Sequence, residues 1–359
     1  MWFIFTIVTT LFWGTADLFY KKGADVNDKY SHLKTAMMVG FVMGIHAIYT
    51  LISSGISYNP KNLLIYLPVS AMYILSMVIG YFGFRYLELS IASPIQNTSG
   101  AVTFILCLIF LQTQIETLTL TGVIFICVGM LLLGMLEKID AESMSKRNEK
   151  KYTIGFIAII IPIIYCIIDS LGTFFDAYYL DDFASTPLVD VTEDTLEDVA
   201  NISYELSFLI VALVILGFLI INAHKKETIS APSRKIETSA TSRKIETSAT
   251  SREIETSAPS RKIEISGPSK SSSIGKLMKT PGFSAYKNRL LAALFETGGQ
   301  AFYVFAMSGN GTVAAPIISC YAVVSLILSR IFLKEKLSRK HYIAISIIIV
   351  GIGILGFCE

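Results

Sequence analysis

Charged residues are scarce in this sequence. Asp, Glu, Lys and Arg together make up 16% of its 359 residues, whereas hydrophobic residues make up 53%. A soluble domain carries about a quarter charged residues, and here the apolar residues are gathered in long runs. The composition therefore excludes an ordinary soluble domain and predicts an all-α protein that spans a lipid bilayer.

Other absences narrow the class further. The five cysteines show no CxxC spacing and have no histidine nearby, so we expect neither a metal site nor a disulfide framework. A GxxxxGK[ST] loop is missing, which leaves ATP binding by this chain without support. We expect no cofactor and no nucleic-acid partner.

No basic stretch precedes the first apolar run, which starts at Trp2. We therefore expect this run to stay as a membrane span rather than to be cleaved as a signal peptide.

Ten apolar runs are candidates for membrane-spanning helices, which need about 20 residues each to cross the hydrocarbon core. They cover residues 2–20, 35–54, 63–84, 91–111, 118–136, 153–175, 206–223, 290–307, 313–333 and 342–357. These continuous runs exclude a membrane barrel, because the strands of a barrel alternate polar and apolar residues.

The basic residues give the helices a direction. Lys and Arg gather on the cytoplasmic side of a membrane. If the N-terminus is placed outside, only Lys61 of the 30 basic residues falls in an external loop. The connection 177–205 holds eight acidic residues and no basic one, as expected of an external loop. We therefore expect a multi-pass protein of the plasma membrane with both termini extracytoplasmic.

The second half of the sequence repeats the first. At an offset of 222 residues, Ala92-x-Pro94 aligns with Ala314-x-Pro316, and the glycines of the fifth and tenth runs coincide. Each half has five runs, so the second copy enters the membrane from the opposite side, as in many transporters. The sequence thus predicts ten transmembrane helices as two inverted five-helix repeats, 1–137 and 153–358, with Pro94 and Pro316 as hinges.

A long connection, 224–289, interrupts the second half. It is rich in Ser and Thr and contains a recurring nine-residue unit, seen for example at 237–245. We expect a disordered, basic cytoplasmic linker, because such a composition cannot bury a core. Contact of the basic units with anionic lipid headgroups is the alternative.

Three features resemble the EamA branch of the drug/metabolite transporter superfamily. They are the pair Trp13 and Gly14, the two Ala-x-Pro sequences, and the turn 332–337, which reads Phe-Leu-Lys-Glu-Lys-Leu. The resemblance implies ten helices in two inverted halves and transport of a small solute, without indicating which solute. The first-half counterpart of the turn, 111–115, lacks the acidic and basic residues. Many family members also keep both termini in the cytoplasm, opposite to the orientation that the charges predict here.

Polar residues inside the apolar runs are the candidates for a solute or ion pathway. A charged side chain at the bilayer centre costs at least ~2.5–3.5 kcal/mol, so each needs a cavity or a partner. Asp17 and Asp169 are expected near opposite faces. They either form the two gates or carry coupling protons, or they lie at the interface as solvated or capping residues. Glu296, Gln300 and Tyr303 have the spacing i, i+4, i+7 and share one helix face. That face either lines a cavity or forms hydrogen bonds to a neighbouring helix.

The remaining candidates are neutral or aromatic. His46 either serves a proton-coupled step or packs through a hydrogen bond. Gln96 and Asn97 follow Pro94, which removes a helical hydrogen bond and leaves a carbonyl free for a solute. The aromatic rings either stack on a solute or pack against each other. The full set of candidates is Trp13, Asp17, His46, Tyr81, Gln96, Asn97, Asp169, Glu296, Gln300, Tyr303 and Tyr321.

These patterns predict a secondary active transporter of a small metabolite or drug-like solute, amino acids and sugar-related solutes included. It would work by alternating access and would not be an enzyme. The alternatives are an integral-membrane enzyme or flippase acting on lipid-linked groups, and a channel. The expected partners are membrane lipids and the small-molecule solute, with a homodimer as a possible assembly.

Overall fold

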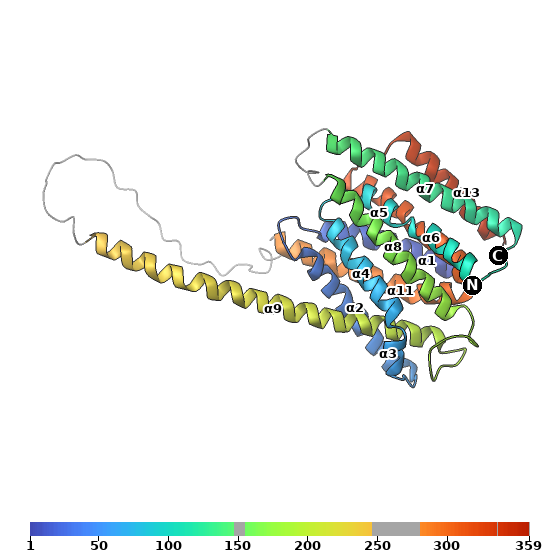
Figure 1. Ribbon diagram of the computed structural model, residues 1–359, viewed down its shortest axis with the longest axis horizontal. Helices are drawn as coiled ribbons and strands as arrows, with labels where there is room; N and C mark the ends of the chain where they lie inside the picture. The colour runs from blue at the N-terminus through green and yellow to red at the C-terminus, as the bar shows by residue number, and fades with distance from the viewer. Residues whose placement is uncertain (147–154, 246–280, 336, 359) are drawn as a thin grey trace, which may run out of the picture. The chain divides into compact units, whose positions relative to one another are not determined.

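The computed structural model describes residues 1–146, 155–245, 281–335 and 337–358, and these residues form helices and no strand (Figure 1). In chain order the helices are α1 (Trp2–Gly23), α2 (Ser31–Ser54), α3 (Lys61–Ile65), α4 (Leu67–Gly83), α5 (Leu89–Gln96), α6 (Ser99–Phe110), α7 (Thr117–Lys146), α8 (Gly155–Leu180), α9 (Leu196–Ile245), α11 (Pro281–Ser319), α12 (Tyr321–Leu328), the π-helix η2 (Ser329–Leu333) and α13 (Arg339–Cys358). The all-helical expectation is confirmed for the described residues.

Eight stretches within the described residues are long and apolar enough to cross a membrane. They are Trp2–Gly23, Ser31–Ser54, Ala92–Phe110, Thr117–Leu136, Ile160–Leu180, Leu196–Ala223, Ser284–Leu333 and Arg339–Cys358. The helix Leu67–Gly83 is apolar but shorter. The runs expected at 290–307 and 313–333 lie in one 50-residue stretch. Asn310 interrupts that stretch with non-helical backbone angles, φ −168° and ψ 74°.

The structure moves several of the expected helix boundaries. Helix α8 continues to Leu180 and α9 already begins at Leu196, so the connection expected at 177–205 is shorter at both ends. Hydropathy missed the start of α9 because its first turn carries Glu197 and Asp198. Acidic residues are favourable at that position, where they face the positive end of the helix dipole.

The chain forms two compact units, one of residues 1–213 and 281–359 and the other of residues 214–280. The linker expected at 224–289 is helical at both of its ends, because α9 runs to Ile245 and α11 begins at Pro281. The disorder expected of the linker stays a prediction. Extending an existing helix by one residue costs far less than starting a new one. The rest of that segment, 246–280, lies outside the described residues.

The first unit is a bundle in which three helix pairs pack along each other: α1 with α11, α4 with α8, and α7 with α13. Figure 1 shows α7 and α13 lying side by side. Their backbones approach closely at two glycines. A Cβ atom added to Gly351 would lie 2.8 Å from the carbonyl oxygen of Gly122. Small residues at such crossings are the usual means by which membrane helices pack tightly.

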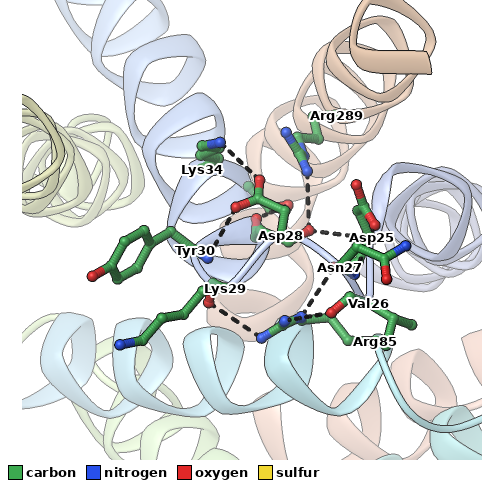
Figure 2. Close-up of polar contacts among 11 residues, drawn as sticks. Asp25, Val26, Asn27, Asp28, Lys29, Tyr30, Lys34, Arg85 and Arg289 are labelled. Atoms are coloured by element: carbon green, nitrogen blue, oxygen red, sulfur yellow. Dashed lines mark hydrogen bonds and ion pairs between the residues drawn. The ribbon is translucent and has the colours of Figure 1, made fainter. Parts of the chain in front are cut away.

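Arg85, next to the end of α4, holds the connection between α1 and α2 (Figure 2). Its buried guanidinium donates hydrogen bonds to the carbonyl oxygens of Asp25, Val26 and Lys29, at 3.1, 3.1 and 3.3 Å. Such a planar group with several donors suits several acceptors at once. This end of the bundle is therefore fixed by side chain to backbone contacts.

A surface ion pair closes the same connection. Lys34 lies 2.7 Å from the Asp28 carboxylate. Partial burial acts to raise the pKa of Asp28, but the hydrogen bonds from Lys34 and from the Tyr30 backbone N–H outweigh it and lower that pKa below its ordinary value. Arg289 of α11 donates to Ser31 at the start of α2, at 3.0 Å, and so joins α11 to this end of α2.

Candidate functional site

A cavity lies inside the first unit and is lined by residues of α1, α4, α5, α6, α8, α9, α11 and α12; we call it the central cavity. The space open to the centres of water molecules is about 60 Å³. One ordered water needs on the order of 10–15 Å³ by this measure. The central cavity thus has room for a few waters or for a small solute.

Nine of the eleven residues singled out from the sequence line this one cavity. They are Trp13, Asp17, Tyr81, Gln96, Asn97, Asp169, Glu296, Tyr303 and Tyr321. Gln300 is buried on α11. Neither Gln300 nor His46 lines the central cavity.

Glu296 anchors one part of the central cavity. The hydroxyl of Tyr20 donates a hydrogen bond to its carboxylate, at 3.1 Å, and the hydroxyl of Tyr81 donates to Tyr20, at 3.0 Å. The indole N–H of Trp13 donates to the backbone carbonyl of Glu296, at 3.3 Å. These contacts tie α1, α4 and α11 together, and they give the carboxylate a neutral donor rather than a countercharge.

Asp17 and Asp169, expected near opposite faces of the membrane, both line the central cavity. Helices α1 and α8 continue to Gly23 and Leu180, beyond the expected ends, so both carboxylates are further from the helix ends than the hydropathy suggested. The hydroxyls of Ser93 and Ser325 donate to Asp17, at 2.7 and 2.8 Å.

Ser76 donates to Asp169, at 3.3 Å. The hydrogen bonds to these two carboxylates therefore also come from neutral hydroxyl groups, as at Glu296.

Tyr66, Tyr73 and Asp176, which lie along one face of α8, were missed by the sequence reasoning. Tyr66 donates a hydrogen bond to the buried carboxylate of Asp176. Tyr73 donates to Thr173, at 2.8 Å, and its hydroxyl lies 2.5 Å from that of Tyr303. Residues 169, 173 and 176 have the same i, i+4, i+7 spacing as 296, 300 and 303. That pattern would have revealed the second polar face if the sixth run had been extended past Phe175.

Helix breaks follow both of the prolines expected to act as hinges. Pro94 lies inside α5, which ends at Gln96, and α6 starts at Ser99. Pro316 lies inside α11, which ends at Ser319, and α12 starts at Tyr321. The missing backbone N–H of each proline weakens the helix there.

Gln96 and Asn97 stand at the first of these breaks. Asn97 donates from its side-chain amide to the Ser93 carbonyl oxygen, at 2.8 Å. The amide nitrogen of Gln96 is buried in the wall of the central cavity without a hydrogen-bond partner.

His46 has a partner that the sequence reasoning placed in a loop. Its Nδ1 atom lies 2.9 Å from both carboxylate oxygens of Glu205. Glu205 is fully buried. The pair joins α2 to α9. The acidic first turn of α9 is a helix-start signal, and it would have moved Glu205 from the loop into the helix.

The eight membrane-length stretches of the described residues, packed around an internal cavity with polar walls, define the class as a polytopic membrane protein. The sequence matches the EamA-like transporter family over residues 1–135 and 272–357, and the chain belongs to that family. The chain is therefore an integral, multi-pass membrane protein of a transporter family.

Comparison with solved structures supports the fold alone. A chain described as "Crystal structure of protein" superposes with a TM-score of 0.55 at 12% sequence identity. The superposition covers 99% of this chain and 96% of that one. A comparison with curated proteins found no match.

Proposed function

We propose that this protein is a secondary active transporter that moves a small metabolite or drug-like solute by alternating access. The central cavity carries the proposal, because it brings carboxylates and aromatic rings from both halves of the chain around one space. Binding sites of secondary transporters lie where the two repeats meet. Amino acids and sugar-related solutes are the first candidates.

The helix pairing supports ten spans in two inverted repeats. The described helices supply ten spans if three groups each count as one span: α3 with α4, α5 with α6, and the part of α11 after Asn310 with α12 and η2. The part of α11 before Asn310 is then a span of its own. The proposed repeat relates α1 to α8 and α4 to the first part of α11. The two pairs α1–α11 and α4–α8 are then equivalent, and α7 and α13 pair with each other.

The breaks after Pro94 and Pro316 supply two equivalent points at which the halves can bend. Broken helices near the membrane midplane are typical of carriers. We propose coupling to an ion gradient or to exchange, in the plasma membrane, with both termini outside and lipids as the surrounding partner. A homodimer is compatible with this arrangement.

Counterflow in proteoliposomes tests the proposal. Vesicles holding the purified protein are loaded with unlabelled solute, and entry of the labelled solute is followed for a broad panel of metabolites. A carrier gives transient, saturable accumulation of label without net flux. A channel gives only equilibration, and an enzyme or flippase acting on lipid-linked groups gives no exchange of soluble solutes. If folded protein is present in the vesicles and no solute of the panel shows saturable exchange, the transporter proposal is wrong.

A further inference from the structure

The wall of the central cavity carries charge of one sign. Asp17, Asp169 and Glu296 line it, whereas no Lys, Arg or His is found among its lining residues in the described part of the chain. The hydrogen bonds described above bring to these carboxylates only serine and tyrosine hydroxyls, which carry no compensating charge. Buried carboxylates require either protons or a countercharge. A positively charged solute supplies that countercharge.

The aromatic rings of the cavity suit the same solute. Trp13 packs between Tyr303 and Tyr321, with ring centroids 4.9 and 5.9 Å away. Tyr20 and Tyr81 form a second pair, 4.5 Å apart. The face of an aromatic ring attracts cations, and groups of such rings recognise quaternary ammonium ligands. An anionic solute would meet both the ring faces and the carboxylates unfavourably.

Gln96 adds an independent sign of a missing ligand. Its side chain is 2% exposed, it lines the central cavity, and its amide nitrogen has no hydrogen-bond partner. Leaving a buried donor unpaired costs about 1–3 kcal/mol. A solute with an acceptor oxygen would satisfy this donor. A small molecule that carries both a positive charge and a hydrogen-bond acceptor would therefore match the chemistry of the cavity wall.

We propose that the solute is a small organic cation, an amine or quaternary ammonium compound that also carries a hydroxyl or carbonyl oxygen. The cation lies between the carboxylates and the rings, and its oxygen accepts a hydrogen bond from Gln96. This assignment rests on the proposed transport function, because it names the solute class of the same cavity. Protons and the cation compete for the same carboxylates, so binding of the cation strengthens as the pH rises.

Binding to the purified, unaltered protein separates charge from shape. The probes are choline and its neutral isostere 3,3-dimethyl-1-butanol, in which carbon replaces the charged nitrogen. Choline is expected to raise the thermal unfolding temperature in a saturable way. The neutral isostere is expected to bind at least ~10-fold more weakly, because it lacks the attraction to the rings. Equal binding of the two compounds, or tighter binding of glucose or succinate, would overturn the cation assignment.

Variants locate the effect in the cavity. Asp169→Asn is expected to weaken choline binding by ~10-fold or more, since it removes one charge that faces the solute. The matched control is Glu193→Gln, which removes an exposed acidic charge from the connection between α8 and α9. Its binding should equal that of the original protein. Equal weakening by both variants would point to general surface charge and would overturn the assignment.

Counterflow keeps the two proposals distinguishable. Saturable exchange of glucose or succinate without exchange of choline leaves a transporter of another solute class, so only the cation assignment falls. Choline that stabilises the protein without any saturable exchange across the metabolite panel leaves the cation site and removes the transport function. Exchange of choline that Asp169→Asn abolishes supports both.

Discussion

At the scale of single residues, the charge of Glu296 is the most direct target. Glu296→Gln keeps the size of the side chain and an oxygen that accepts from Tyr20, but it removes the charge. We expect solute exchange to be abolished while the amount of folded protein in the membrane stays the same. Counterflow together with size-exclusion chromatography in detergent measures both quantities.

The control for this variant is Cys320→Ser. Cys320 is buried and its thiol contacts the carbonyl of Pro316, at 3.4 Å, a contact that a serine hydroxyl can replace. Exchange by this variant should be unchanged. Unimpaired uptake by Glu296→Gln would remove Glu296 from the site.

The pair of His46 and Glu205 makes a separate prediction about stability. Glu205→Ala removes the partner of a histidine that lies half-buried between α2 and α9. Hydrogen bonds to charged groups contribute ~1.5–3 kcal/mol, and we expect a loss of that order in the free energy of unfolding. Denaturant unfolding in detergent measures it. In a double-mutant cycle with His46→Ala the effects should be non-additive. Strict additivity would show that the two side chains are not coupled.

At the scale of helices, the glycines between α7 and α13 set how closely these two elements pack. Gly351→Ala would place a methyl group 2.8 Å from the carbonyl oxygen of Gly122, so the helices must move apart. Overpacking of this kind costs ~1–3 kcal/mol. Gly353→Ala, two residues further on, meets nothing within 4 Å and should be neutral or slightly stabilising. Equal melting temperatures of the two variants would contradict the close packing.

The elements also show what hydropathy could and could not predict. The run 118–136 contains no charged residue and matches the span Thr117–Leu136 closely. The run 206–223 missed the first ten residues of its helix. Hydropathy detects lipid-facing surface, whereas Glu205 is covered by protein. A helix end covered in this way is polar in sequence and still inside the bundle.

At the scale of the whole molecule, polar and aromatic residues inside apolar runs were enough to find nine residues of the cavity wall but not the contacts between them. The bond from Tyr20 to Glu296 joins residues 276 positions apart, and it depends on how α1 and α11 are rotated against each other. Neither composition nor spacing encodes that rotation. The hydrogen bonds from Arg85 to the connection between α1 and α2 could not be predicted either. Their acceptors are backbone carbonyls, which every residue has.

The orientation of the molecule in the membrane is open to a direct test with its own cysteines. Cys358, at the end of α13, is exposed, whereas Cys107, Cys166 and Cys320 are buried and Cys127 is partly so. If both termini are extracytoplasmic, a membrane-impermeant maleimide added to intact cells should label Cys358, and Cys358→Ser should remove the label. In that background, Lys340→Cys places a thiol in the first turn of α13, directly after the last basic connection. Charge placement puts this connection inside, so it should react only after permeabilisation. The reverse pattern would show that the charges of this chain do not set its orientation.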